Sequence, residues 1–311
     1  MVKLGTICRL VFKRLLPAVF LSAALFQIPL AEELWVVEKL DGAEVPADPG
    51  SQILQKVPGG LPDGYIAEHP EGDIVKAWYG DPTRRYGHGI LGDAIEAGAL
   101  HIEISNGKQL SLQLPETEVF EDRTPRLVDL DGDGAIEIVT IRSSVSKGAS
   151  VTIYGLVNGA LVQRATNGFI GRSNRWLNIA GIASFAGGQE QQIAYVETPH
   201  IGGTLYFYAF RNGSLVRTGA MQDFSNHAIG TREMQLSAVV DIDGDMRMEL
   251  AVPSDNRQSL RIIGTGQNGP YEQASIMLPA RISKLFARRG QGSDINFIVL
   301  LDDGQTYRIR R

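Results

Sequence analysis

The chain has 311 residues, of which 43% are apolar, and a formal net charge of −5 at pH 7. This length allows one large domain or two ordinary ones, and the apolar content is sufficient for a substantial core, which argues against a disordered chain. The negative charge argues against nucleic acid as a partner. The chain contains 35 glycines, and short β-rich runs recur between turn residues, so the composition predicts an all-β protein.

The first 31 residues have the layout of a signal peptide. Four basic residues precede the apolar run Leu15–Ala31, and no acidic residue occurs before Glu32. The run is short for a membrane span, so we expect cleavage and a periplasmic or secreted protein. A cut after Ala31 places Pro29 where a small residue is preferred, so an uncleaved anchor is the alternative. Only that alternative would bring the protein into contact with a membrane.

The mature chain would contain no cysteine, because the single one, Cys8, lies in the basic part of the leader. An extracytoplasmic protein without disulfides needs another source of stability, and bound metal is a natural one. Removal of residues 1–31 takes away four positive charges, so the formal charge falls from −5 to −9. The larger negative charge strengthens the argument against nucleic acid.

A repeat of about 55 residues organises the rest of the chain. The acidic segment Asp129–Glu137 has a second copy, Asp241–Glu249, that begins 112 residues later. Near the midpoint, Ser184–Gln192 has the same length and is likewise followed by a β-rich run, but it keeps no carboxylate except Glu190. We call this degenerate copy the worn loop. Three short β-rich runs follow each copy, which gives a meander of four strands. Such repeats are typical of β-propeller blades, because one meander cannot bury both of its faces.

The predicted domain organisation places the propeller after residue 80. Its repeats are 80–118, 124–166, 177–222, 235–279 and 282–311. The last repeat is one strand short, and the segment 32–79 can supply that closing strand from 34–40 or from 73–79. We therefore predict five blades of four antiparallel strands. Six is the alternative, if residues 34–79 form a blade of their own.

The first acidic loop has the ligands that Ca²⁺ requires. Calcium takes about six to eight oxygen ligands, which a tight loop can supply from alternate positions. The predicted ligands are Asp129, Asp131, Asp133, the carbonyl of Ala135, and Glu137. Four carboxylates this close together would repel one another without a cation. A plain Asp-Gly hairpin turn without metal is the alternative. An EF-hand is excluded, because position 12 is Thr140 and the flanking residues are typical of strands.

The second acidic loop has the same spacing with one difference. Its predicted ligands are Asp241, Asp243, Asp245, the carbonyl of Arg247, and Glu249. Met246 stands where the first loop has Gly134, and a left-handed turn there would cost about 1 kcal/mol or more. We assign no metal to the worn loop 184–192, where hydrogen-bonded turns from Ser184, Gln189 and Gln192 are expected in place of the ion.

The pattern Asp-x-Asp-Gly-Asp-Gly-x-x-Glu between short strands resembles the FG-GAP and VCBS repeat proteins, including the calcium loops of integrin α-subunit propellers. The leader and repeat layout is similar to that of short bacterial VCBS-repeat proteins. The resemblance is strong at 124–140 and 236–252, and weaker at 80–118, 177–200 and 282–311. It implies a propeller with calcium between the first two strands of a blade. It implies no particular activity, since such repeats occur in adhesins, lectin-like modules and enzyme appendages.

Arginine recurs in the segments that lead into the blades. The candidate ligand-binding residues are Arg85, Arg126, Arg175 and Arg232. If they lie at matching places, they form a ring near one end of the propeller axis that suits an anionic ligand, such as an acidic glycan. The simpler alternative pairs each of them with a nearby carboxylate, or stacks it on Trp176 or Tyr86.

His200 and His227 lie in glycine-bearing loops, where functional residues are common. Neither belongs to a known metal or nucleophile motif, so histidines hydrogen-bonded to the backbone are the simpler expectation. The sequence therefore favours a non-catalytic binding or scaffold module for a protein or glycan outside the cytoplasm. The alternative is a glycan lyase or hydrolase. That enzyme would need a paired His and carboxylate, or two carboxylates about 5–10 Å apart, facing the axis.

Overall fold

The computed structural model describes residues 35–42, 56–289 and 295–311, which lie in one compact unit. In these residues the chain forms 21 β-strands, β1 to β21, and no α-helix, so the all-β prediction is confirmed. Accordingly, the described ranges contain no helix that is long and apolar enough to cross a membrane. The predicted signal peptide, residues 1–31, lies outside the described residues.

Two sheets are meanders of four antiparallel strands formed by consecutive segments. The first contains β11 (Leu177–Ala183), β12 (Gln192–Glu197), β13 (Thr204–Arg211) and β14 (Ser214–Gln222). The second contains β15 (Ala238–Val240), β16 (Glu249–Pro253), β17 (Ser259–Gly266) and β18 (Gly269–Met277). The strands lie at the predicted β-rich runs. In β13, for example, buried and partly exposed side chains alternate along most of the strand.

A nine-stranded sheet contains two further meanders. Its strands are β2 (Ala67–Glu68), β3 (Ile74–Thr83), β4 (Glu96–Ile104), β5 (Gln109–Gln113), β6 (Glu118–Phe120), β7 (Arg126–Val128), β8 (Glu137–Ser144), β9 (Gly148–Val157) and β10 (Ala160–Thr166). β2 to β5 form one meander and β7 to β10 the other. The short strand β6 joins them, because it pairs with both β4 and β8. The first meander begins at β2, which lies before residue 80, the predicted start of the first repeat.

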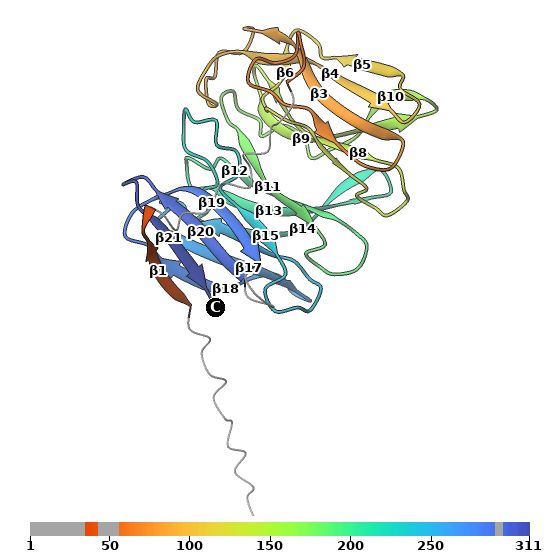
Figure 1. Cartoon of the computed structure of the whole chain (residues 1–311). Coiled ribbons are helices and arrows are strands. Elements are labelled where there is room, and N and C mark those ends of the chain that lie inside the picture. Colours follow the sequence, from red (N-terminus) through yellow and green to blue (C-terminus); the bar gives the residue numbers. More distant parts are fainter. Residues whose placement is uncertain (1–34, 43–55, 290–294) are drawn as a thin grey trace, which may run out of the picture. The chain divides into compact units, whose positions relative to one another are not determined.

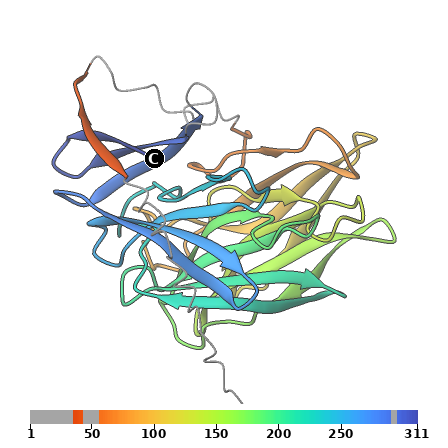
Figure 2. The same cartoon turned by 90° about the horizontal axis from the view of Figure 1, so that it is seen from below.

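The remaining sheet combines both ends of the described chain. Its strands are β1 (Val36–Leu40), β19 (Ile282–Arg289), β20 (Ile295–Leu301) and β21 (Thr306–Arg310), in the order β1-β21-β20-β19. β1 runs antiparallel to β21, as Figures 1 and 2 show, with Val36 opposite Arg310. Of the two candidates for a closing strand, 34–40 overlaps β1. The other, 73–79, overlaps β3 in a different sheet.

Asn-Gly turns set the register of two outer hairpins. Asn158 and Gly159 join β9 to β10 with φ values of 51° and 77°, and Asn212 and Gly213 join β13 to β14 with 50° and 72°. Positive φ at both central residues is the geometry of a type I′ turn, whose twist matches that of the strands. Asn and Gly adopt this conformation more easily than other residues, so these hairpins follow directly from the sequence.

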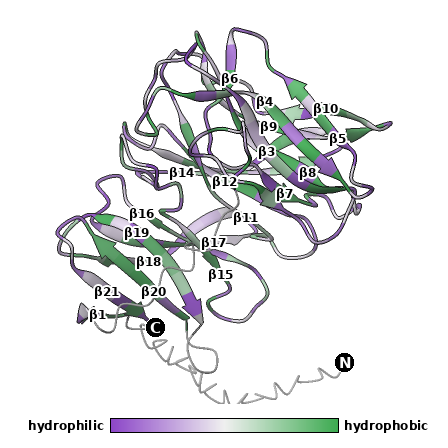
Figure 3. Ribbon diagram, turned by 45° about the horizontal axis from the view of Figure 1, so that its top comes forward, coloured by the Kyte–Doolittle hydropathy of each residue, from purple (hydrophilic) through white to green (hydrophobic). Residues whose placement is uncertain are grey.

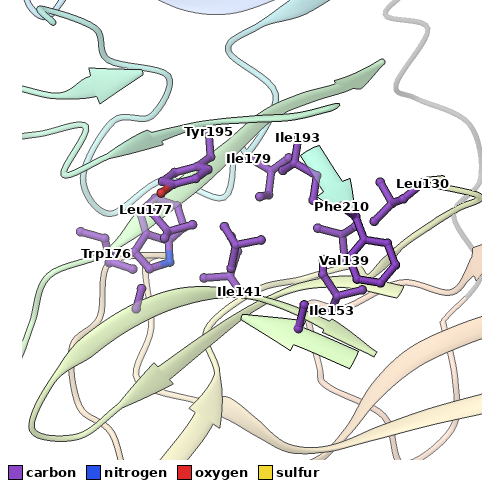
Figure 4. Packing of buried hydrophobic residues seen from close by; sticks show 14 of the residues in the cluster. Leu130, Val139, Ile141, Ile153, Trp176, Leu177, Ile179, Ile193, Tyr195 and Phe210 are labelled. Atoms are coloured by element: carbon purple, nitrogen blue, oxygen red, sulfur yellow. The ribbon is translucent and has the colours of Figure 1, made fainter. Parts of the chain in front are cut away.

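The core lies between sheets that pack face to face. Figure 4 shows Val139 and Ile153, from β8 and β9, beside Ile179, Ile193 and Phe210 of the next meander. Each large apolar side chain buried in this way contributes about 1.5–3 kcal/mol to folding. In Figure 3 hydrophobic residues are concentrated on the strands, while the connections between them are largely hydrophilic.

Successive meanders are also neighbours in space. Among first strands, β2 contacts β7, β11 contacts β15, and β15 contacts β19. Among last strands, β5 contacts β10, β10 contacts β14, and β14 contacts β18. The first strands are therefore together on one side of the stacked sheets. Their ends bring together the acidic loops and the Arg- and His-bearing segments.

Candidate functional site

The first strands separate two chemically different ends of the molecule. Each of β7, β11 and β15 starts after an Arg- or His-bearing segment and finishes at an acidic or worn loop. We call the loops 129–136, 184–191 and 241–248 the loop end. We call the opposite connections, 84–95, 121–125, 167–176, 198–203 and 223–236, the polar end.

Hydrogen bonds link each loop at the loop end to the preceding meander. The amide of Ile136 donates to Asp73 Oδ1 at 2.9 Å, and the amide of Gln191 donates to the carbonyl of Leu130 at 2.9 Å. The amide of Met248 donates to the carbonyl of Ser184 at 3.2 Å. These bonds fix the loops relative to one another across four meanders.

The first acidic loop brings three carboxylates together. One oxygen each of Asp129, Asp131 and Glu137 lies within 4.8 Å of the other two. Asp129 accepts hydrogen bonds from the amides of Gly132 and Gly134, at 2.7 and 2.9 Å. This folds the loop around its side chain. Oxygens grouped in this way suit a hard cation such as Ca²⁺.

Glu137 is the buried member of that group. Its side chain is fully buried, accepts a hydrogen bond from the amide of Leu130 at 3.0 Å, and lies 3.4 Å from Arg164 Nη1. Burial raises the pKa of Glu137 to about 7, because the ionised carboxylate loses hydration. Of the other predicted ligands, Asp133 lies outside the three-carboxylate group and accepts from the amide of Ala135 at 2.8 Å.

The second acidic loop repeats this geometry. Asp241, Asp243 and Glu249 form the corresponding group within 4.8 Å, and burial raises the pKa of Glu249 to about 7. Met246 has φ 68°, so it adopts the left-handed conformation expected at this position, as Gly134 does with φ 87°.

The remaining predicted ligands of the second loop lie beside that group rather than in it. Asp245 accepts a hydrogen bond from the amide of Arg247 at 2.8 Å. Gln273 lies 3.5 Å from Glu249, whereas the corresponding partner of Glu137 in the first loop is an arginine.

Local hydrogen bonds close the worn loop 184–192. Ser184 Oγ donates to the carbonyl of Gly188 at 2.9 Å, which is the hydrogen-bonded turn expected from this residue. The two other residues expected to help behave differently: the carbonyl of Gln189 accepts from Gln191, and Gln192 donates across the sheet to Thr218. The one carboxylate in the loop, Glu190, forms two bonds to Arg211 at 2.6 and 2.7 Å, which lower its pKa.

A central cavity of about 910 Å³ lies between the first strands. Residues from β7, β11, β15 and β19 line it, together with Tyr65 from the segment before β2. The basic lining residues are Arg123, Arg126, Arg232 and Lys284, and the acidic ones are Asp122 and Glu233. Basic groups therefore outnumber acidic ones in the wall, although the whole chain is acidic.

Two of the four predicted arginines, Arg126 and Arg232, line this cavity. Arg126 pairs with Asp122, which is fully buried and also accepts from the Tyr79 hydroxyl at 2.9 Å. Arg232 bonds to Asp63 at 3.1 Å and to Asp93 at 2.7 Å, while 47% of its side chain stays exposed. Both thus follow the simpler alternative of pairing with carboxylates, and they also face one cavity.

The other two predicted arginines do not line the cavity. Arg85 donates to the carbonyl of Glu118 at 2.8 Å and lies 3.4 Å from Glu116, while Arg175 donates to the carbonyl of Asn174 at 2.9 Å. The sequence candidates did not include Arg123, which bonds to Asp63 and donates to the carbonyl of Arg232. Arg123 stands in the segment that leads into β7, three residues before Arg126, and this position could have identified it as a further candidate.

His200 and His227 bond to each other at the polar end. His200 Nε2 lies 3.0 Å from His227 Nδ1, and His227 Nε2 lies 3.1 Å from the carbonyl of Thr231. Trp176 stacks on His200 with an interplanar angle of 3°. Burial lowers the pKa of His200 to about 4 and that of His227 to about 3, so both are neutral at pH 7.

A different histidine has a carboxylate partner. His88 Nδ1 lies 2.6 Å from Glu121 Oε1, and the second carboxylate oxygen accepts from Ser143. Glu121 is fully buried, whereas 12% of the His88 side chain is exposed. Burial raises the pKa of the nearby Glu96 to about 10, so that carboxyl group is neutral at pH 7. The glycine-rich turn around His88 offered a weak signal, but Glu121 lies 33 residues away.

No protein-family model matches the chain, and no curated protein matches it in sequence. The solved structures that resemble it include rhamnogalacturonan lyase YesW, with a TM-score of 0.45, 14% identity, and coverage of 80% of this chain and 52% of that one. The Dos1 propeller has a TM-score of 0.41, 9% identity, and coverage of 79% and 68%. BBS1N in complex with ARL6DN has a TM-score of 0.40, 18% identity, and coverage of 70% and 60%. The chain thus spans about half the length of YesW.

Proposed function

We propose that the chain is an extracytoplasmic five-bladed β-propeller whose central cavity binds an anionic ligand, such as an acidic glycan, without transforming it. Three four-stranded sheets and the two meanders of the nine-stranded sheet supply the five blades. The neighbouring first strands support this arrangement, because propeller blades pack with their first strands around the axis. The loops that resemble FG-GAP and VCBS repeats support it as well.

The basic lining of the cavity is the observation on which this function rests. Arg232 is held by Asp63 and Asp93, neither of which lines the cavity, so its guanidinium group is fixed in place while 47% of the side chain stays exposed. Arg123 shares Asp63 with it. Preorganised guanidinium groups bind carboxylates through paired hydrogen bonds at low entropic cost.

Calcium in the two acidic loops would brace the blades rather than bind the ligand. The loops lie at the opposite end of the first strands from Arg123 and Arg232, so a cation there would not contact a ligand beside those arginines. The hydrogen bonds between neighbouring loops would transmit its stabilising effect to adjacent blades.

The direct test is a binding titration with oligogalacturonate and with a neutral oligosaccharide of equal length. Oligogalacturonate should bind more tightly, and Arg232→Gln should weaken its binding by about tenfold or more, since a charged hydrogen bond is worth about 1.5–3 kcal/mol. Arg175→Gln is the matched control, because Arg175 is partly exposed and lies outside the cavity lining. Equal binding of the two sugars, or equal effects of the two substitutions, would contradict the proposal.

The His88–Glu121 pair favours a second candidate, a glycan-processing enzyme. A fully buried carboxylate that holds Nδ1 leaves Nε2 as the proton-transferring atom of the imidazole, which is the arrangement of a general base. Prolonged incubation of polygalacturonate with wild type and with His88→Gln tests it by the appearance of new chain ends. Release by wild type but not by the variant would replace the binding module with the enzyme.

A further inference from the structure

The wall of the central cavity changes character from one end to the other. At the polar end it contains three arginines, Arg123, Arg126 and Arg232, and two carboxylates, Asp122, which pairs with Arg126, and Glu233. Towards the loop end it contains Val128, Ile182, Val239 and Phe286, each from the first strand of a different sheet. The cavity therefore has a basic half and an apolar half.

The apolar half borders the core, since Val128, Ile182 and Val239 pack against buried clusters, but its side chains keep part of their surface exposed. Val128, Ile182, Val239 and Phe286 are all partly exposed, whereas Leu130, in the loop after β7, is fully buried. Contact with an apolar group would remove this surface from water, with a gain of about 25 cal/mol per Å². A fully polar ligand would leave that gain unused.

The acidic loops determine the orientation that an amphiphilic ligand would take in the cavity. Asp129 directly follows Val128, and Asp241 follows Val239 after one residue. An anionic head group at the loop end would face these carboxylates, whereas at the polar end it would meet guanidinium groups. Both effects place the charged head at the polar end and the apolar body between the first strands.

We infer that the cavity binds an amphiphilic carboxylate, with its head on Arg123 and Arg232 and its unbranched apolar chain against Ile182, Val239 and Phe286. This inference rests on the proposed anion-binding function and specifies the ligand class of the same cavity. A volume of about 910 Å³ lies within the usual range for small-molecule sites, about 300–1,000 Å³, so a medium-length acyl chain fits.

The test is a calorimetric titration of the whole chain with octanoate, decanoate and dodecanoate below their micellar concentrations. Octyl glucoside provides the same chain without the charge, and oligogalacturonate provides the charge without the chain. The affinity should rise with each methylene by up to about fourfold, which corresponds to about 0.8 kcal/mol. Octyl glucoside should bind more weakly than octanoate.

Two kinds of substitution separate the halves of the cavity. Arg232→Gln should weaken all carboxylates by a similar factor and leave the dependence on chain length intact. Ile182→Asn should reduce that dependence, and Phe286→Ser, in another sheet, gives a second variant if the first does not fold. Melting curves establish that each variant is folded, and Arg175→Gln should bind like wild type.

The outcomes separate this inference from the proposed function. Binding of oligogalacturonate together with an affinity for carboxylates that does not change with chain length would overturn the inference and leave the anion-binding function standing. Octyl glucoside bound as tightly as octanoate would overturn the inference as well. If neither the fatty carboxylates nor oligogalacturonate bind, both proposals are wrong.

Discussion

The pair of Arg126 and Asp122 offers a sharp test of how the wall of the cavity is held together. Asp122 is fully buried, and three further donors bond to it: the hydroxyl of Tyr79, the amide of Arg123 and the amide of Ile141, at 2.9, 2.9 and 3.3 Å. Arg126→Met would leave this carboxylate buried without its cation. Loss of one partner of a buried pair costs about 3–5 kcal/mol, and the three remaining donors place the expected cost near the lower end, about 3 kcal/mol.

Chemical denaturation at pH 7 measures this cost, and a melting curve should show a decrease of about 6–12 °C. The double variant Arg126→Met/Asp122→Asn should regain part of the loss, because its buried group is neutral. Arg232→Met is the control: it removes a guanidinium group that also pairs with carboxylates but is 47% exposed, so it should cost less than about 1 kcal/mol. The buried pair does not stabilise the wall of the cavity if Arg126→Met costs no more than Arg232→Met. The same holds if the cost of the double variant equals the sum of the costs of Arg126→Met and Asp122→Asn.

Three further predictions concern the loops and the histidine pair. Calcium at about 100 times its Kd should stabilise the fold by about 2.7 kcal/mol per site, so a chelator should lower the melting temperature. Asp131→Ala should reduce this calcium response, whereas Glu190→Ala, in the worn loop, should not; identical responses would mean that the acidic loops are only turns. Met246→Gly should stabilise the protein by up to about 1 kcal/mol in urea unfolding, because glycine adopts positive φ without strain, and an unchanged midpoint would contradict that cause. His200 and His227 have folded-state pKa values of about 4 and 3, below the ordinary value of 6.5. Between pH 6.5 and about 3, the unfolded chain therefore binds more protons than the folded chain. The free energy of unfolding should fall as the pH drops through this range. A His227→Gln variant should show a shallower decline in melting temperature over that range, and a decline as steep as that of wild type would show that other groups cause it.

The strands and hairpins were predictable because their signals are local. The spacing of Asp129–Glu137 and Asp241–Glu249 located the turns between first and second strands, and β-rich runs located the strands that follow. The unusual residue at Met246 was predictable too, since an aligned glycine at position 134 implied positive φ. Each of these features depends on residues that are close together in the sequence.

The joining of two meanders and the pairing of the site residues were not predictable in the same way. β6 has only three residues, and its pairing with both β4 and β8 depends on how two meanders pack. The bond between His88 and Glu121 likewise depends on the packing of a β3–β4 connection against the segment after β6. Arg85 and Arg175 resembled Arg126 and Arg232 in sequence, but bonds to nearby carbonyls direct them elsewhere.

The pairing of β1 with β21 has a mechanical consequence. Val36, at the start of β1, lies opposite Arg310, at the end of β21. A force that pulls these two residues apart therefore acts at one end of the two-stranded ladder. Such a load opens the interstrand hydrogen bonds one after another instead of shearing them all at once. Four of the five residues of β1 are exposed, so little buried surface resists the peeling. Under a load that pulls β1 from its N-terminal side and β21 from its C-terminal side, this seam should open first.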